Sequence, residues 1–186
     1  MNFNAHSNLD GRHAVLSPSN YYWLKYDDDK LYTTYLNMLA KEHGTELHDF
    51  AAQCIRLNQK LPKSTKTLNR YVNDAIGFKM TPEQALYYSP NCFGHADTIC
   101  YRDDILRIHD YKSGQVPAHM EQLRIYAALF CLEYGITPFD ISEINLRIYQ
   151  SDDVVYELAD PNEISEIMDI IVKFDTIINN LKEGTR

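Results

Sequence analysis

The chain has 186 residues, the size of one domain with a substantial core, and 45% of them are hydrophobic. Its formal net charge is −8, so any contact with nucleic acid must depend on a local basic patch. The four cysteines lack CxxC spacing, which argues against a zinc or iron–sulfur cluster and favours reduced thiols in a cytoplasmic protein. We expect neither a signal peptide nor a membrane-spanning segment. The sequence predicts a single domain over residues 1–186, in which residues 1–16 are loosely ordered.

The first elements are predicted to be helical. Ser17 precedes a proline and is expected to begin a helix. The aromatic run at residues 21–23 favours a core anchor over a platform for base stacking. Residues 28–43 show helical periodicity. Gly44 is expected to end that helix and Thr45 to cap a new one.

The next predicted helix places a histidine on its apolar face. His48, Ala51, Ala52 and Ile55 are spaced at i, i+3, i+4 and i+7, so His48 faces inward. Such a histidine is either a hydrogen-bonded core residue or a metal ligand, and its context favours the metal ligand.

Basic residues outnumber acidic ones between residues 56 and 79, where a helix is expected from Ser64 or Thr65. This segment would either bind DNA phosphates, without sequence preference, or form an ordinary solvated surface. The candidate DNA-binding residues are Lys60, Lys63, Lys66 and Arg70. Residues 81–84 predict a further short helix start, with proline at its first position.

Two strands, residues 93–101 and 105–112, are predicted to form a hairpin across a short polar turn. Side-chain alternation places Asp110 and Lys112 on one face of the second strand. Antiparallel pairing would bring Asp97 close to Asp110. Because neighbouring carboxylates repel, a divalent cation with oxygen ligands is the expected occupant between them.

The remaining elements complete a mixed fold. Residues 118–134 predict a helix that is apolar nearly all round and therefore buried against a sheet. Residues 143–149 and 154–158 predict two more strands, and a final helix begins near Pro161. The expected class is α/β (α+β), with a central mixed β-sheet flanked by helices.

Four short motifs occur in a fixed order along the chain: Gly44–His48, Gly94–Asp97 (GxxD), Asp110–Gly114 (DYKSG) and Gln122–Tyr126 (QxxxY). Together they resemble the PD-(D/E)XK nuclease superfamily, in its RecB-like and phage exonuclease branch, over about residues 17–135. The proline that names the superfamily is absent before Asp97, as is usual in this branch.

The resemblance implies a restriction-endonuclease-like core and a metal-dependent DNA nuclease, with an exonuclease acting on DNA ends favoured. It implies one or two Mg²⁺ or Mn²⁺ ions, bound by His48, Asp97, Asp110 and the backbone carbonyl of Tyr111. The catalytic set it implies is Asp97, Asp110, Lys112, Gln122 and Tyr126. DNA is the expected partner, alongside a homo-oligomer or a recombination or replication protein, in the cytoplasm of a bacterial or phage-infected cell.

Two alternatives remain open. The first is a catalytically inactive DNA- or protein-binding module on the same fold, and the second is a different metal-dependent hydrolase that uses His48, Asp97 and Asp110. The intact Asp–Asp–Lys set favours an enzyme, because burying charge without a use for it is costly. The sequence does not distinguish an exonuclease from an endonuclease.

Overall fold

A computed structural model describes residues 14–114 and 116–184. The chain forms two compact units, Met1–Thr45 and Glu46–Arg186. Residues 1–16 were predicted to be loosely ordered, and residues 1–13 of that segment lie outside the described residues.

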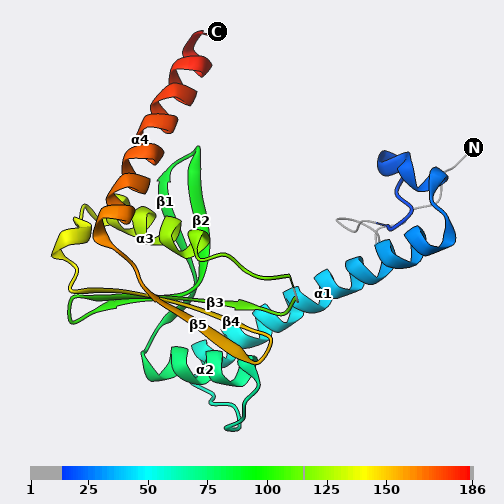
Figure 1. Cartoon of the computed structure of the whole chain (residues 1–186), viewed down its shortest axis with the longest axis horizontal. Coiled ribbons are helices and arrows are strands. Elements are labelled where there is room, and N and C mark those ends of the chain that lie inside the picture. Colours follow the sequence, from blue (N-terminus) through cyan, green and yellow to red (C-terminus); the bar gives the residue numbers. More distant parts are fainter. Residues whose placement is uncertain (1–13, 115, 185–186) are drawn as a thin grey trace, which may run out of the picture. The chain divides into compact units, whose positions relative to one another are not determined.

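The described helices and strands follow one another in groups rather than singly (Figure 1). In chain order they are η2 (Pro18–Lys25), α1 (Asp28–Arg56), α2 (Thr67–Gly77), β1 (Thr81–Ser89), β2 (Cys92–Arg102), β3 (Ile105–Lys112), α3 (Glu121–Tyr134), η3 (Pro138–Asp140), β4 (Glu143–Gln150), β5 (Asp153–Leu158) and α4 (Pro161–Gly184).

The predicted helix start at Ser17 leads into a 3-10 helix, η2, rather than an α-helix. Ser17 flanks this helix without a side-chain capping bond, and its carbonyl accepts a hydrogen bond from Trp23 Nε1 at 2.9 Å. Tyr21 and Tyr22 stack on each other and are 56% and 59% exposed. The prediction of a core anchor is therefore wrong for these two tyrosines.

Helix α1 continues through Gly44, so the predicted helix break is wrong. A glycine inside a helix costs only about 1 kcal/mol relative to alanine, which is small beside the hydrogen bonds of a helix as long as α1. Thr45 does not cap a new helix; its hydroxyl donates to the Lys41 carbonyl at 3.2 Å. Further along α1, Ala51 and Ile55 are buried, as the predicted apolar face requires.

The described strands form one sheet in the order β1-β2-β3-β4-β5. Neighbouring strands are antiparallel except β3 and β4, which are parallel. Helix α3 lies between β3 and β4 in the chain and makes the crossover that a parallel pair requires. The predicted class, a mixed central sheet flanked by helices, is confirmed.

The predicted helix start at residues 81–84 is wrong, because these residues begin strand β1. Pro82 is tolerated there since β1 is an edge strand, where a missing backbone N–H leaves less of the ladder unpaired. The pairing with β2 over the whole length of β1 outweighs the local helix-start signal. Helix α2 begins at Thr67, slightly later than expected, and α3 begins at Glu121.

Helix α3 lies on one side of the sheet and α2 on the other (Figure 1). An apolar core lies on each face. One core joins β3 residues such as Leu106 and Ile108 to α3 and the start of α4. The other joins Tyr111 and Tyr149 to α2 and the end of α1. Strand β3 is therefore buried on both faces, and it ends in the charged residues described next.

Candidate active site

The hairpin of β2 and β3 brings two acids together. Its register pairs Thr98 with His109, and one further step along the same register places Asp97 opposite Asp110. Asp97 Oδ2 accepts a hydrogen bond from the Tyr111 backbone N–H at 2.9 Å. The structure thus brings the two predicted acids to neighbouring positions at one end of the hairpin.

Both acids are harder to ionise than usual. Burial raises the pKa of Asp97 to about 6, with a further contribution from the charge of Asp110; His48, the Tyr111 N–H and Lys112 oppose the rise. Burial also raises the pKa of Asp110, which is 2% exposed, while Lys112 and His48 lower it. The site therefore favours a bound cation electrostatically, because a cation would stabilise both carboxylates.

Lys112 is the last residue of β3, and its side chain reaches Gln122 of α3. Its Nζ is 3.0 Å from Asp110 Oδ1 and 3.3 Å from Gln122 Oε1. Gln122 Nε2 in turn donates to the Tyr126 hydroxyl at 3.4 Å. The structure therefore joins Asp110, Lys112, Gln122 and Tyr126 in one chain of polar contacts, in which the glutamine and tyrosine orient the lysine.

The glycine of the GxxD motif has a steric role here. A Cβ atom at Gly94 would lie 2.9 Å from Cε1 of Tyr126 and 3.5 Å from its hydroxyl oxygen. The tyrosine ring is rigid and cannot move aside like the end of a flexible chain. Gly94 therefore leaves the space in which the Tyr126 ring packs closely against β2.

Helix α1 adds an imidazole to the acids. His48 Nδ1 is 3.4 Å from Asp97 Oδ2, and its ring packs at 5.5 Å from the Tyr111 ring. Within the described part of the chain, His48, Glu83 and Asp97 form a group that could hold a metal ion, with one donor atom of each within 4.8 Å of the others. Asp110 is not a member of this group.

Glu83 is the residue that sequence reasoning missed. It lies in β1, in the segment that was predicted to begin a helix. Because no strand was predicted there, the sequence could not show which residue of β2 lies opposite Glu83. The run of alanine, leucine and two tyrosines that follows it is typical of a strand and could have indicated one. Pro82 pairs with Thr98 and Gln84 with Ala96, so Glu83 lies opposite Asp97.

The donors present suit a divalent metal ion. Carboxylate oxygens are the ligands that Mg²⁺ and Mn²⁺ prefer, and an added imidazole favours Mn²⁺. In the described residues, Asp110 Oδ2 is buried and has no hydrogen-bond partner, which leaves it available as a ligand. In a strand, the N–H and C=O of one residue point to the same side, so the Tyr111 carbonyl faces β2 and Asp97, as its N–H does.

The predicted DNA-binding residues gather around the start of α2. All four are exposed, and Lys60, Lys63 and Arg70 line a cavity of about 290 Å³. Lys66 flanks the first residue of α2. On the buried side of the same helix, Tyr71 stacks on Tyr111 with ring centroids 5.7 Å apart.

Tyr71 also connects this region electrostatically to the acids. Burial, and then the charges of Asp97, Asp110 and Glu83, raise its pKa well above the usual value. The buried side of α2 therefore lies close enough to the acidic residues to sense their charge, and the predicted DNA-binding residues lie on exposed parts of the same segment.

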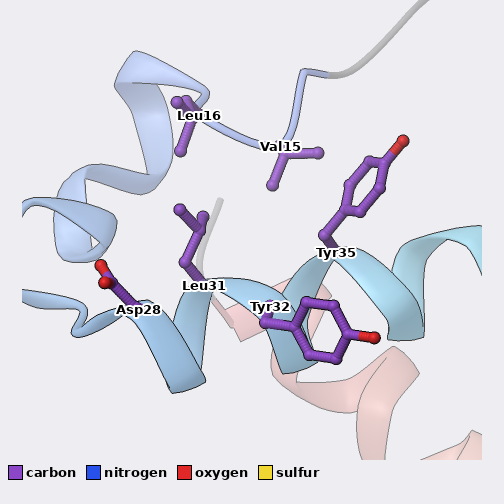
Figure 2. A pocket seen from close by; sticks show the side chains of 6 residues that line it. All are labelled: Val15, Leu16, Asp28, Leu31, Tyr32 and Tyr35. Carbon is purple, nitrogen blue, oxygen red and sulfur yellow. The ribbon is translucent and has the colours of Figure 1, made fainter.

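A second cavity, of about 440 Å³, lies in the N-terminal unit (Figure 2). Its lining is Val15, Leu16, Asp28, Leu31, Tyr32 and Tyr35. Figure 2 shows the aliphatic side chains of Val15, Leu16 and Leu31 turned toward a common space, with one carboxylate at its margin. None of the predicted site residues contributes to this cavity, and it offers no set of metal ligands.

Comparison with known proteins adds one finding. Residues 82–153 match a family model described as "Protein of unknown function (DUF2800)". The match spans strands β1 to β4 and includes Asp97, Asp110 and Lys112, whereas His48 and the predicted DNA-binding residues lie outside it. The chain matches no curated protein and no solved structure. Among the described helices, none is both long and apolar enough to cross a bilayer.

Proposed function

We propose that this chain is a metal-dependent DNA nuclease that hydrolyses phosphodiester bonds and acts on DNA ends. The observation that carries the proposal is the arrangement of Asp97, Asp110 and Lys112. A nearly fully buried carboxylate is paired with an ammonium at 3.0 Å, has its second oxygen unpartnered, and lies beside another carboxylate. Burying these charged groups lowers the stability of the fold. Binding a cation and a substrate would explain why the fold keeps them.

The chain's own residues have separate tasks in this proposal. A divalent ion held by His48, Asp97, Asp110 and the Tyr111 carbonyl would lower the pKa of a bound water and neutralise charge on the scissile phosphate. Lys112 Nζ, held by Asp110 and Gln122, is placed to donate hydrogen bonds where negative charge develops on the phosphate oxygens. Tyr126 keeps Gln122 in position through its hydroxyl.

DNA would approach across the start of α2. The exposed basic residues there supply local positive charge on a chain whose net charge is −8. They would bind the phosphate backbone, which positions DNA without reading its sequence. Action on DNA ends rests on the resemblance to RecB-like and phage exonucleases.

The test is digestion of end-labelled linear duplex DNA and closed circular DNA, with Mn²⁺, Mg²⁺ or EDTA. We expect the linear duplex to be degraded with a divalent ion and to stay intact in EDTA. Asp110→Asn and Lys112→Ala should each lower the rate by about 100-fold or more, as is usual when a group that stabilises developing charge is removed. Asp103→Asn and Lys173→Ala change exposed residues of the same types and are the matched controls.

The other possible results of this digestion would each favour a different function. Full activity in the folded Asp110 or Lys112 variant would refute the nuclease mechanism. DNA that is bound but stays uncut with both metals would favour the inactive binding module. Cleavage of small phosphoesters alone would favour a different hydrolase, and rapid cutting of closed circles would show an endonuclease. Thermal unfolding of every variant confirms that it is folded.

A further inference from the structure

Strand β2 carries an aromatic residue on the same face as the candidate site. Phe93, His95 and Asp97 are two residues apart, so their side chains point to the same side of the strand. Tyr87 of β1 lies directly opposite Phe93 in the register. The hairpin of β1 and β2 therefore leads from the carboxylate of Asp97, past an exposed imidazole, to a pair of aromatic rings.

The two rings are stacked and largely exposed. Their centroids lie 6.4 Å apart with an interplanar angle of 30°, and Tyr87 and Phe93 are 49% and 62% exposed. On the opposite face of the hairpin, Leu86 and Ala96 are buried in the core formed with α3. A cross-strand aromatic pair adds some stability to a hairpin, but this pair is turned away from the core and presents a flat apolar surface to solvent.

The outer part of the hairpin is held by two helices. The backbone N–H of Tyr87 donates to Glu133 Oε2 of α3 at 2.8 Å. Near the tip, Asn91 Nδ2 donates to Asp175 Oδ1 of α4 at 2.7 Å, and the Ser89 hydroxyl donates to the same oxygen. Figure 1 shows α3 and α4 beside this part of the hairpin. The exposed rings are therefore carried on a fixed support, which lowers the entropy lost when a ligand binds to them.

The rings lie at a distance that suits a DNA strand reaching the acids. The four-residue step from Phe93 to Asp97 spans about 14 Å of extended strand, roughly the length of four stacked nucleotides. Aromatic rings stack on the faces of unpaired bases of any sequence, whereas bases inside a duplex are already covered by their neighbours. Residues 84–96 contain no lysine or arginine, so this surface suits bases rather than phosphates.

We propose that Tyr87 and Phe93 form a stacking platform for the unpaired bases of a single-stranded DNA end, and that the same strand continues along the hairpin to Asp97. His95 is exposed on this path and offers a further ring. The proposal deepens the nuclease function and rests on it for the choice of DNA as the ligand. It names a DNA end with unpaired bases as the substrate class.

Fluorescence anisotropy in EDTA measures binding without cleavage. The probes are a short oligo(dT) strand, the same strand with abasic sites, and the blunt duplex that the first strand forms with oligo(dA). Replacing Tyr87 and Phe93 together by valine removes both rings and keeps residues that favour a strand. We expect this double variant to bind oligo(dT) at least about 10-fold more weakly, with an unchanged affinity for the duplex. Its slope of log K against log salt should stay that of the wild type, because no phosphate contact is removed.

The abasic strand tests the role of the bases directly. The wild type should bind it more weakly than oligo(dT) by about the same factor, and the double variant should bind both strands equally. This comparison on the wild type needs no variant, and thermal unfolding shows whether the double variant is folded. Tyr87→Phe keeps the ring and should bind like the wild type. The matched control is Tyr156→Val, which removes a 48% exposed tyrosine of β5 and should leave every affinity unchanged.

A wild type that binds oligo(dT) no better than the abasic strand, or a folded double variant that binds oligo(dT) as well as the wild type does, would overturn the proposal. The outcome for the nuclease function is separate. DNA cleavage without ring-dependent binding would leave the function standing without the platform. Ring-dependent binding of oligo(dT) without any cleavage in Mn²⁺ or Mg²⁺ would leave the platform standing without the nuclease.

Discussion

Asp97→Asn should make the metal-free protein more stable, although it removes a residue central to the site. Asp97 is ionised at neutral pH in a buried position beside Asp110, and this crowding raises its pKa from 3.8 to about 6. Asparagine removes the charge and keeps an oxygen that can accept the Tyr111 N–H. We therefore expect the variant to unfold at a higher temperature than the wild type in EDTA at pH 7.5.

The magnitude follows from the difference in pKa between the folded and unfolded states. An acid whose pKa is raised on folding is stabilising only when protonated, and it destabilises the fold as pH rises through the folded-state pKa. Two pKa units at 1.36 kcal/mol each correspond to about 3 kcal/mol, fully expressed above pH 6. For a chain of this size, that change in the free energy of unfolding raises Tm by about 6–12 °C. Below pH 4 both proteins carry a neutral side chain, and the difference should vanish.

Thermal unfolding from pH 3.5 to pH 8, followed by circular dichroism in EDTA, measures this effect. Asp103→Asn is the control, because Asp103 is an exposed residue of the β2–β3 turn whose positive φ asparagine tolerates equally well. Added Mn²⁺ should raise the Tm of the wild type much more than that of Asp97→Asn, because only a ligand of the native state shifts the equilibrium. The reasoning fails if Asp97→Asn is no more stable than wild type at pH 7.5, or if its advantage persists unchanged at pH 3.5.

Two further predictions concern packing and DNA binding. Gly94→Ala should lower the free energy of unfolding by about 1–3 kcal/mol in urea, since its methyl group would overlap the Tyr126 ring. Gly77→Ala has open space around the new methyl group and should be neutral or slightly stabilising; equal losses in both variants would contradict the steric argument. Replacing three basic residues by glutamine should reduce the slope of log K for DNA against log salt by up to about 3, and an unchanged slope would make the patch ordinary surface. These residues are Lys63, Lys66 and Arg70.

Sequence periodicity was sufficient for the strands at the centre of the fold. Residues 105–112 alternate so clearly that the shared face of Asp110 and Lys112, and the approach of Asp97 across the turn, could be predicted before any coordinates. The Lys112–Gln122–Tyr126 contacts agree with the motif order, because a helix that follows a strand in a crossover packs back against it. Alternation predicted the strands, whereas the parallel pairing of β3 and β4, which makes the sheet mixed, depends on the crossover through α3.

Local signals failed where tertiary contacts outweighed them. Residues 81–84 resemble a helix start, yet pairing with β2 makes them a strand and brings Glu83 opposite Asp97. Gly44 resembles a helix end, yet α1 continues because one glycine costs little against the hydrogen bonds of a long helix. Sequence thus determined which side chains could share a strand face, since that depends on neighbours two residues apart. Only the tertiary structure decided that β1 pairs with β2, and with it the position of Glu83, the third carboxylate of the site.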